Sequence, residues 1–304
     1  MLLKQILDGL NSVCKTTEIK TEISLSDYTT FKVGGPAEIF ATPDESDLIS
    51  ILTYCVENKI DYTVLGHGSN VLVSDKGIKG VVLVIGKAMS EVLVSGTKIY
   101  AKAGALLSSV ARSAVGNSLT GFEFAAGIPG TVGGACVMNA GAYDGEMKNV
   151  LESIRVFDPR DCKVKELSAK DLDLGYRHSI IPEKEYIVLE AVLNLTEGDV
   201  NSIQAKMDDF AKKRREKQPL EYPSAGSTFK RPEGYFAGQL IQEARLRGVC
   251  VGDAQVSDKH CGFIINRGNA EAADIRDLIY EVIERVEEVH GVTLEPEVKM
   301  IGDF

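Results

Sequence analysis

Apolar residues in the first part of the chain follow the period of an amphipathic helix between two strand-like runs. On one face of the predicted helix they recur three or four positions apart, at Leu48, Ile51, Leu52, Cys55 and Val56. Short apolar runs at 37–41 and 62–65 flank this helix, and the segment 42–45 (TPDE) predicts a capping box with proline at the first helical position. The pattern therefore predicts a β-α-β unit near the N-terminus.

The later pattern predicts further elements of both kinds. The segments 153–157 and 163–167 alternate about the turn 158–161, which is typical of a hairpin. The other predicted elements are helices at 1–13, 106–116, 199–217, 235–247 and 270–290, and strands at 71–73, 81–85, 90–102, 187–195, 249–257, 262–266 and 293–301. A break at Pro219 and Pro223 indicates a domain boundary, so the pattern predicts an α+β protein in two halves.

The composition fits a soluble globular protein and narrows its partners. The chain has 304 residues, of which 44% are hydrophobic and 26% charged, enough for two or three domains with cores. Its formal net charge of −10 at pH 7 argues against binding to nucleic acid or to membrane surfaces. No stretch approaches the ~20 apolar residues that span a bilayer. Lys4, Gln5 and Asp8 interrupt the N-terminal apolar residues, which indicates an amphipathic helix rather than a signal peptide.

The cysteines and histidines lack the spacing of metal sites or disulfide frameworks. The six cysteines contain no C-x-x-C pair, and the four histidines are equally dispersed. We therefore expect no metal site, reduced thiols and a cytoplasmic location.

Two glycine-rich segments are the clearest candidates for ligand binding. The segment 126–145 reads AGIPGTVGGACVMNAGAYDG, and the segment 64–73 reads VLGHGSNVLV. Such a segment is often only a tight turn, but backbone N–H groups between glycines also form a nest for phosphate. Two of them in one chain favour a large ligand with a pyrophosphate. Neither has the G-x-G-x-x-G pattern between a strand and a helix, which disfavours a Rossmann domain.

Three polar segments stand in turn-rich or apolar surroundings: YRHS at 176–179, SAGSTFK at 224–230 and LEPEV at 294–298. Each has an ordinary explanation, namely a surface ion pair, a turn cap and an exposed edge carboxylate. In a site, Arg177 would instead bind a carboxylate bidentately. The basic run 212–217 is either a solvated helix end or a site for a doubly phosphorylated substrate. These residues predict an enzyme with a phosphate-bearing cofactor and an anionic substrate, without specifying the reaction.

Together these segments resemble the UDP-N-acetylenolpyruvoylglucosamine reductase family, over about residues 20–302. The matching motifs are, in order, TTFKVGGPA from residue 29, LGHGSNVLV from 65, AGIPGTVGGA from 126, MNAGAY from 138, YRHS from 176, AGSTF from 225, AQVSDKHCGFIIN from 254 and LEPEV from 294. The glycine motifs alone resemble the broader FAD fold of the vanillyl-alcohol oxidase type. The Tyr-Arg, Gly-Ser and Glu-Pro-Glu-Val elements narrow the resemblance to the reductases.

The resemblance implies an α+β protein in which a two-subdomain FAD-binding module of the vanillyl-alcohol oxidase type precedes a C-terminal α+β substrate-binding domain. The implied boundaries are 1–86, 87–198 and 199–304. FAD is the implied cofactor and NADPH the implied electron donor. The implied cofactor-binding residues are Gly66, Gly68, Ser69, Asn70, Gly127, Ile128, Pro129, Gly130, Thr131, Gly133, Gly134 and Ala135.

Three residues match catalytic positions of that family. Arg177 would bind the carboxylate of an enolpyruvyl group and stabilise the charge that develops after hydride transfer from flavin N5. Ser227 would donate a proton to the carbanion-like centre. Glu297 matches a carboxylate that acts on the same group, either protonated or paired with Arg177. The implied reaction is NADPH-dependent reduction of UDP-N-acetylglucosamine enolpyruvate to UDP-N-acetylmuramate, in peptidoglycan precursor synthesis.

Four residues are implied to bind the substrate: Tyr176, Arg214, Lys217 and Lys230. The predicted strand 187–195 follows Arg177 closely, which leaves no room for the insertion whose tyrosine covers the substrate in the longer form of the enzyme. The chain therefore resembles the shorter form. In that form the resemblance does not say what covers the substrate diphosphate.

Two other interpretations stay open on the sequence alone. One is another flavin oxidoreductase of the same fold that oxidises a small alcohol or hydroxy acid, against which the Gly-Ser and Glu-Pro-Glu-Val elements argue. The other is a non-catalytic nucleotide-binding protein, against which the combination of Arg177, Ser227 and Glu297 argues. For the reductase we expect a UDP-sugar as the small-molecule partner, and a monomer or weak homo-oligomer.

Overall fold

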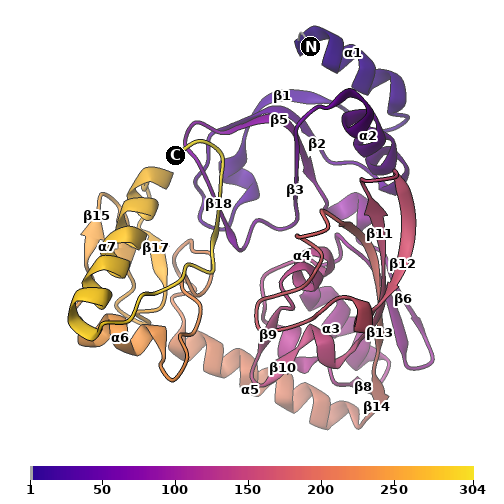
Figure 1. Cartoon of the computed structure of the whole chain (residues 1–304). Helices are drawn as coiled ribbons and strands as arrows, with labels where there is room; N and C mark the ends of the chain where they lie inside the picture. Colours follow the sequence, from indigo (N-terminus) through magenta and orange to yellow (C-terminus); the bar gives the residue numbers. More distant parts are fainter. Residues whose placement is uncertain (1–2) are drawn as a thin grey trace. The chain divides into compact units, whose positions relative to one another are not determined.

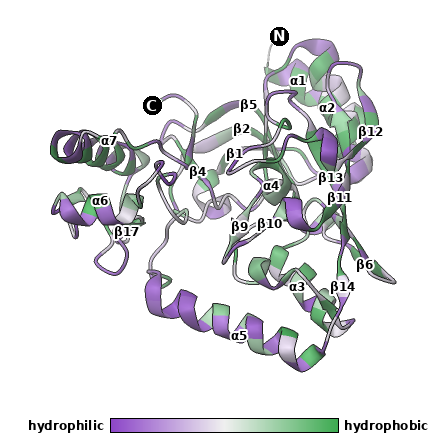
Figure 2. Cartoon of the chain, turned by 60° about the horizontal axis from the view of Figure 1, so that its bottom comes forward, coloured by the Kyte–Doolittle hydropathy of each residue, from purple (hydrophilic) through white to green (hydrophobic). Residues whose placement is uncertain are grey.

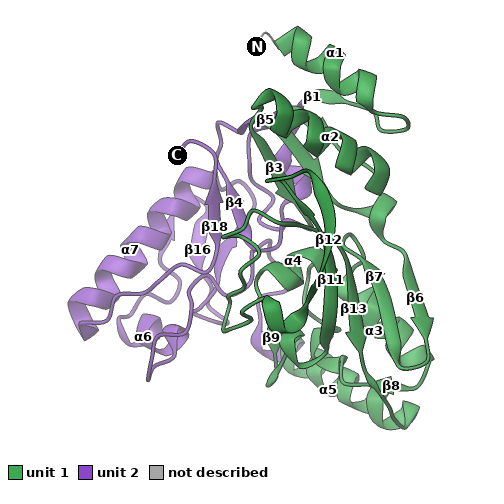
Figure 3. Cartoon of the chain, turned by 45° about the vertical axis from the view of Figure 1, so that its right-hand side comes forward, with its two compact units in different colours: residues 1–21, 39–67, 80–214 green, residues 22–38, 68–79, 215–304 purple. Residues whose placement is uncertain are grey.

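The computed structural model describes residues 3–304, and the chain divides into two compact units (Figures 1 and 3). Unit 1 comprises Met1–Thr21, Ile39–His67 and Gly80–Arg214, and unit 2 comprises Glu22–Glu38, Gly68–Lys79 and Arg215–Phe304. Each unit is thus assembled from segments that are far apart in the sequence.

A four-stranded sheet contains the first strands of the chain, in the order β1-β2-β5-β3. These strands are β1 (Lys20–Ser24), β2 (Pro36–Ala41), β3 (Tyr62–Leu65) and β5 (Ile78–Val84). Strand β3 pairs in parallel with β5, which lies between β2 and β3 in the sheet. The helix α2 (Glu45–Asn58) connects β2 to β3 and buries Leu48, Ile51, Leu52 and Cys55 completely, as the periodicity predicts.

The start of α2 differs from the predicted capping box. The N-cap is Asp44, whose carboxylate accepts the backbone N–H of Asp47 at 2.9 Å. Pro43 therefore precedes the cap instead of occupying the first helical position. Aspartate is a stronger N-cap than threonine, and its charge complements the positive end of the helix.

A second sheet, in unit 1, is antiparallel and has the order β12-β11-β13-β7-β6. Its strands are β6 (Val92–Ser95), β7 (Lys98–Lys102), β11 (Leu151–Asp158), β12 (Lys163–Ser168) and β13 (Ile187–Asn194). The hairpin predicted about 158–161 is confirmed. The strand-like stretch 90–102 is a hairpin, because Gly96 turns the chain with φ +57°.

The remaining elements of unit 1 are helices and short strand pairs. The helices are α1 (Leu3–Val13), α3 (Leu107–Gly116), α4 (Val132–Val137) and α5, which runs Val200–Lys217 and so ends in unit 2. The short pairs are β8 (Leu119–Thr120) with β14 (Thr196–Glu197) and β9 (Gly141–Ala142) with β10 (Gly145–Glu146). Single 3-10 turns of the chain cover Leu25–Tyr28, Lys87–Met89, Glu123–Ala125, Met147–Asn149 and Ala169–Asp171.

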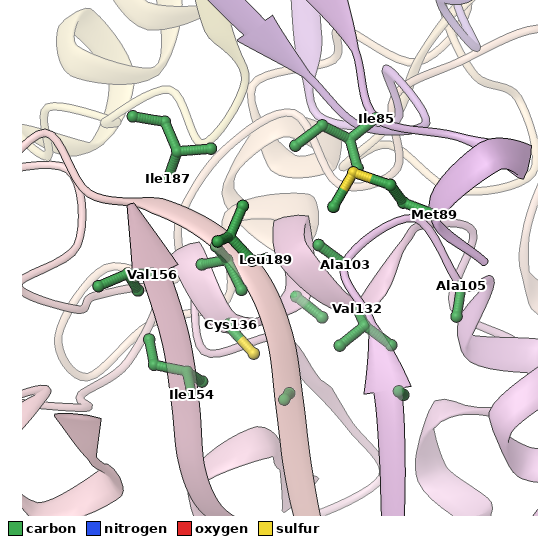
Figure 4. Close-up of a cluster of buried hydrophobic side chains, with 14 of the residues drawn as sticks. Ile85, Met89, Ala103, Ala105, Val132, Cys136, Ile154, Val156, Ile187 and Leu189 are labelled. Carbon is green, nitrogen blue, oxygen red and sulfur yellow. The ribbon is translucent and has the colours of Figure 1, made fainter. Parts of the chain in front are cut away.

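The core of unit 1 holds α4 against the antiparallel sheet. Figure 4 shows Val132 and Cys136 of α4 beside Ile154 of β11 and Leu189 of β13, and all four side chains are fully buried. Burial of one such aliphatic side chain contributes about 1.5–3 kcal/mol. Because α4 lies within the second glycine-rich segment, this packing fixes the middle of that segment.

Unit 2 has its own core and two small sheets. The antiparallel strands β15 (Cys250–Val251), β16 (Ala254–Val256) and β17 (Ile264–Asn266) form one sheet, and β4 (Val71–Val73) pairs in parallel with β18 (Lys299–Ile301) to form the other. The helix α7 (Ala272–His290) buries Ile275, Leu278, Ile279 and Val282 in this core.

Two predicted elements of unit 2 are shorter in the structure. The helix expected at 235–247 is α6 (Ala237–Glu243), and the strand expected at 293–301 is only β18. Pro296 has no backbone N–H to donate to a ladder, so the strand pattern around it does not form a continuous strand.

The helices differ in their polarity. Figure 2 shows α5 as hydrophilic along most of its length, and Ile203 is its one buried position among the residues that the structure describes. Among residues 3–304, no helix combines the length and the apolar character that crossing a membrane requires.

Candidate functional site

The two glycine-rich segments meet in unit 1. Gly66 follows β3, and a Cβ atom at this position would lie 2.4 Å from Oγ1 of Thr131. No residue with a side chain fits at position 66 without displacing Thr131. The glycine in the first segment therefore permits contact with the second segment.

Backbone hydrogen bonds connect the second glycine-rich segment to the residues that follow β7. Gly130 accepts the N–H of Leu107 at 3.0 Å, and Gly133 donates its N–H to the carbonyl of Ala103 at 2.8 Å. A Cβ atom on Gly133 would lie 3.0 Å from the Cβ of Ala103. Of the predicted cofactor residues, Gly133, Gly134 and Ala135 belong to α4, whereas Gly127, Ile128, Pro129, Gly130 and Thr131 precede it.

The first segment continues into unit 2 at Gly68. This glycine has φ +66°, and a Cβ atom there would lie 2.0 Å from the carbonyl oxygen of Tyr28. The carbonyl of Gly68 accepts the N–H of Thr30 at 3.1 Å. Only glycine combines this conformation with such close backbone approach. The contact joins the loop to residues 29–36, which lie in the motif TTFKVGGPA of the family resemblance.

Several backbone donors of these segments have no hydrogen-bond partner among the residues that the structure describes. Within residues 3–304, the N–H groups of Ser69, Asn70, Gly130 and Thr131 donate to no backbone or side-chain acceptor. Backbone N–H groups that need an acceptor favour an anion such as a phosphate.

Asn70 also connects the first segment to a predicted catalytic residue. Its amide Nδ2 donates to the carbonyl of Glu297 at 3.2 Å, and its own carbonyl accepts the N–H of Lys299 at 3.0 Å. Both bonds lie within unit 2, at the point where β4 and β18 begin to pair. The cofactor segment and the Glu-Pro-Glu-Val segment therefore share one hydrogen-bonded framework.

Thr228 joins the two segments that carry Ser227 and Glu297. The backbone N–H of Glu297 donates to the carbonyl of Thr228 at 2.8 Å. The neighbouring pair, Phe229 and Pro296, forms an isolated antiparallel β-bridge. The two predicted catalytic residues are therefore brought to neighbouring backbone positions in unit 2, although they are far apart in the sequence.

Thr228 has two further bonds and no exposed surface. Its N–H donates to Gly262 at 2.8 Å, and its hydroxyl accepts the N–H of Ile264 at 3.0 Å. Thr228 was not predicted as a functional residue, because a threonine in a polar, turn-rich segment has no distinguishing sequence pattern. A buried hydroxyl with a backbone donor is visible only in the fold.

The side chains of Ser227 and Glu297 differ in exposure. Ser227 follows Gly226, which has φ +77°, and its hydroxyl is exposed, with no hydrogen-bond partner among the described residues. Glu297 is 7% exposed, whereas Glu295, two residues earlier, is exposed and forms an ion pair with Lys230. The Glu-Pro-Glu-Val segment thus buries one carboxylate and leaves the other at the surface.

Arg177 stands in a tight turn of unit 1. Gly175 and His178 exchange backbone hydrogen bonds at 3.1 and 3.2 Å, and Arg177 between them has φ +52°. A left-handed conformation is costly for a long side chain and often marks a functional position. The guanidinium donates to the carbonyl of Gly141 at 3.2 Å and lies 5.3 Å from the centre of the Tyr176 ring.

Two residues that the sequence analysis did not single out hold this turn. Asn139 is fully buried, and its amide donates to the carbonyl of Gly175 at 2.8 Å. The hydroxyl of Ser179 donates to the carbonyl of Val137. In the sequence, the sign of this role of Asn139 was an amide side chain among the small residues of the motif MNAGAY.

Arg214 lies against the second glycine segment. A Cβ atom on Gly127 would lie 3.2 Å from Cδ of Arg214 and 3.5 Å from its Nη1. Burial lowers the pKa of the Arg214 guanidinium, a shift that the nearby Tyr143 opposes. No carboxylate pairs with Arg214 among the described residues, so its charge is available to an anion next to Gly127.

The two predicted substrate-binding lysines, Lys217 and Lys230, belong to unit 2. Lys217 is exposed at the end of α5 and is close enough to His260 to act on that imidazole. Burial lowers the pKa of His260, and the charges of Arg247 and Lys217 lower it further. Lys230 is occupied by its ion pair with Glu295.

Unit 1 also contains a cavity of about 560 Å³ beside β3. Its lining residues are Val56, Ile60, Asp61, Tyr62, Val64, Pro159, Arg160, Glu185, Tyr186 and Ile187. The lining is mixed, because the charged residues Asp61, Arg160 and Glu185 lie beside the apolar ones. The guanidinium carbon of Arg160 lies 5.1 Å from the centre of the Tyr186 ring.

These features fit an extended dinucleotide such as FAD. Two glycine segments in contact, unpaired backbone N–H groups and Arg214 beside Gly127 suit a diphosphate.

Comparison with known proteins decides between the possible readings. Residues 36–168 match a model of the FAD binding domain, and residues 218–301 match the C-terminal domain of UDP-N-acetylenolpyruvoylglucosamine reductase. A protein of that name from Clostridium novyi (strain NT) is 52% identical over 97% of this chain and 95% of its own length. Another, from Caldanaerobacter subterraneus subsp. tengcongensis, is 48% identical over 98% of both chains.

The chain belongs to the UDP-N-acetylenolpyruvoylglucosamine reductase family. The solved UDP-N-acetylenolpyruvylglucosamine reductase from Thermus caldophilus has a TM-score of 0.81 at 36% identity, and the match covers 94% of this chain and all of that one. The resemblance seen in the sequence is therefore confirmed, as are the α+β fold and the FAD-binding module of an oxidoreductase.

A more distant neighbour shows how far the fold extends beyond the reductase family. The glucose dehydrogenase Phl p 4.0202 has a TM-score of 0.51 at 15% identity over 64% of this chain, which indicates a shared fold only. The interpretation as a different flavin oxidoreductase is not favoured, because the reductases match nearly the whole chain at about 50% identity.

Proposed function

We propose that the chain catalyses the NADPH-dependent reduction of UDP-N-acetylglucosamine enolpyruvate to UDP-N-acetylmuramate. The observation that carries this proposal is the framework of unit 2. There, direct hydrogen bonds connect Asn70 of the cofactor segment to Glu297, and Glu297 to the residue after Ser227. A cofactor segment, a hydroxyl and a buried carboxylate are thus joined in one unit.

FAD fits the backbone donors described above, and Gly66–Asn70 and Gly127–Ala135 would hold it. When bound, FAD takes up hydride from NADPH and supplies it to the terminal alkene carbon of the enolpyruvyl group. The protein then has two tasks. It must stabilise the negative charge that develops beside the carboxylate, and it must supply one proton to the carbon that carries the ether oxygen.

Arg177 performs the first task. Its planar fork binds the enolpyruvyl carboxylate and stabilises charge as it delocalises onto that group. The left-handed turn and the bond from Asn139 to Gly175 fix the position of Arg177 before substrate arrives. A fixed donor costs no reorganisation during the reaction.

Ser227 performs the second task. Its hydroxyl is exposed and makes no hydrogen bond within the described chain, so it is available to the substrate. A hydroxyl is a weak acid, but it suffices when the acceptor is a strongly basic carbanion-like carbon. We propose that Glu297 acts on the same group, either protonated or paired with Arg177. The proposed substrate contacts are Tyr176, Arg214, Lys217 and Lys230. For Lys230 this requires exchange of Glu295 for the ligand.

A product analysis tests the proposal. The purified holoenzyme is incubated with NADPH and the enolpyruvyl UDP-sugar, and the sugar nucleotide is examined by mass spectrometry and by NMR. We expect one NADPH oxidised for each sugar nucleotide that gains two hydrogen atoms, with a new lactyl methyl signal. Oxidation of a small hydroxy acid by oxygen, without oxidation of NADPH driven by the sugar, would instead support the other flavin oxidoreductase.

We further propose that the enzyme works in the cytoplasm as a monomer or weak homo-oligomer. All six cysteines are free thiols, which supports a reducing compartment. Size-exclusion chromatography with light scattering over a range of protein concentrations tests the oligomeric state.

A further inference from the structure

The orientation of one peptide bond decides where a predicted phosphate donor points. In the trans peptide that joins Gly68 to Ser69, the Gly68 carbonyl and the Ser69 N–H point in opposite directions. The carbonyl accepts the backbone N–H of Thr30 at 3.1 Å and the Thr30 hydroxyl at 3.4 Å. The Ser69 N–H therefore points away from Thr30, and it donates to no acceptor within residues 3–304.

Gly68 leaves this orientation open to change. A residue without a Cβ atom adopts left-handed and extended conformations with similar ease, so the peptide that follows Gly68 is free to rotate. In the reversed orientation, the carbonyl oxygen would face a bound anion in place of the N–H. A phosphate nest at this loop therefore requires a contact that holds the carbonyl on the other side, and Thr30 makes that contact.

Thr30 belongs to a turn that side chains hold in place. Thr29 is buried, and its hydroxyl donates to the carbonyl of Val33 at 2.8 Å. Phe31 is fully buried in the core of unit 2, and its carbonyl accepts Nδ2 of Asn266 at 3.0 Å. Both neighbours of Thr30 are thus fixed, Thr29 by a bond inside the turn and Phe31 by a residue of β17.

Asn266 uses its whole side-chain amide in this framework. The residue is 1% exposed, and its Oδ1 accepts the N–H of Gly268 at 2.8 Å and that of Ala270 at 3.1 Å. An oxygen that accepts two N–H groups settles which way the amide points. The nitrogen therefore faces the carbonyl of Phe31.

The same strand supports the segment that carries Ser227. The backbone N–H of Asn266 donates to the carbonyl of Pro223 at 2.9 Å. Ile264, two residues earlier in β17, donates its N–H to the hydroxyl of Thr228 at 3.0 Å. One strand of unit 2 thus holds both the turn beside the cofactor segment and the segment of the proposed proton donor.

We propose that Asn266 is a positioning residue for the diphosphate of FAD. It acts through Phe31 and Thr30: the amide holds the turn, the turn holds the Gly68 carbonyl, and the Ser69 N–H points to the phosphate before FAD binds. A donor that is oriented in advance costs no reorganisation on binding. The inference rests on the proposed contact of Ser69 with the cofactor and not on the proposed reaction, so its failure would leave the reaction in place.

Asn266→Asp tests the bond to Phe31 separately from the other bonds of the amide. The ionised carboxylate has nearly the same shape and still accepts two backbone N–H groups, but it cannot donate to the Phe31 carbonyl. We expect the Kd of the apoprotein for FAD, measured by fluorescence titration, to rise about tenfold. In phosphorus NMR at saturating FAD, the diphosphate resonances should move towards those of free FAD. Thr30→Val removes only the hydroxyl bond to Gly68 and should raise the Kd about threefold.

Asn269→Asp is the matched control, because Asn269 is exposed and its side chain makes no hydrogen bond to the part of the chain that the structure describes. This variant should keep the wild-type Kd and phosphorus resonances. Urea unfolding of each apoprotein separates positioning from stability. An Asn266→Asp protein that is less stable, yet binds FAD with wild-type Kd and resonances, would overturn the proposal. If Asn266→Asp does not fold, Thr30→Val decides alone, and wild-type values in that variant would equally overturn it.

Discussion

The backbone N–H of Glu297 donates to the carbonyl of Thr228 at 2.8 Å, and this bond places two distant segments of the sequence side by side. Ser227 precedes Thr228 directly, so the exposed hydroxyl and the buried carboxylate share one short backbone connection. The hydroxyl of Thr228 is itself used by Ile264. The geometry of the proposed proton donor thus depends on a buried residue that does not touch the substrate.

Replacement of Ser227 by alanine should separate the two half-reactions. Reduction of the flavin by NADPH should stay near the wild-type rate, since it needs no proton from Ser227. Reoxidation by the enolpyruvyl sugar should slow by about 10²–10⁴-fold, the usual contribution of a positioned acid. Stopped-flow absorbance measures both rates. Ser224→Ala, in the same segment, is the control, and an equal loss in both half-reactions would mean that Ser227 is structural.

Arg177→Lys should impair the second half-reaction only. Lysine keeps the charge but cannot form two parallel hydrogen bonds to a carboxylate. We expect flavin reoxidation to fall by about 10²–10³-fold, in the range for loss of a preorganised donor, while flavin reduction by NADPH is retained. Arg112→Lys on α3 controls for the general effect of the exchange. A near-neutral rate of reoxidation would remove Arg177 from the site.

Gly68→Ala should weaken FAD binding. The added Cβ would lie 2.0 Å from the carbonyl oxygen of Tyr28, so the backbone around Ser69 and Asn70 must shift. We expect at least about a tenfold increase in the Kd for FAD, measured by quenching of flavin fluorescence during reconstitution of the apoprotein. Gly116→Ala is the control, because no atom lies within 4 Å of its added Cβ. Full flavin content in Gly68→Ala would argue against a role of this loop in binding.

Asp47 links stability to pH. It is fully buried, and burial opposes its ionisation, but the N–H groups of Lys15, Thr16 and Thr17 hold its pKa well below the usual range. The folded-state pKa is lower than the unfolded value, so this stabilisation is present above pH ~3.9 and is lost as the pH falls towards the folded value.

Asp47→Asn should therefore lower the free energy of unfolding by about 2 kcal/mol at pH 7, from the loss of hydrogen bonds to a charged acceptor. The difference from wild type should shrink below pH ~4. Urea unfolding at both pH values measures it, with Asp8→Asn on the exposed side of α1 as the control. A difference that does not depend on pH would contradict the assignment.

Most helices and strands with a clear periodic spacing of apolar residues were predicted from the sequence. Leu48, Ile51, Leu52 and Cys55 mark α2 because a helix that buries one face requires that spacing. The prediction was wrong where two local sequence patterns pointed to different structures. Pro43 suggested the first helical position, yet Asp44 caps the helix, and the apolar alternation around Pro296 overstated the last strand.

The site was predicted less completely, because its residues are far apart in the sequence and are connected only by hydrogen bonds in the fold. The glycine segments and Arg177, Ser227 and Glu297 stand in motifs, so a resemblance can select them. Their assigned roles are proposals that the experiments above address. Thr228 and Asn139 have no such pattern, since their importance comes from bonds to Glu297, Ile264 and Gly175 that only the fold creates. Local patterns do not encode such long-range partners.

The most direct measurement is an anaerobic absorbance experiment on the purified protein with bound FAD. NADPH is added first, and UDP-N-acetylglucosamine enolpyruvate second. The account predicts that the flavin absorbance bleaches with NADPH and recovers when the enolpyruvyl sugar is added. A flavin that bleaches without recovery would contradict the proposed substrate. A protein that takes up no flavin, even after incubation with FAD, would contradict the function of the glycine segments.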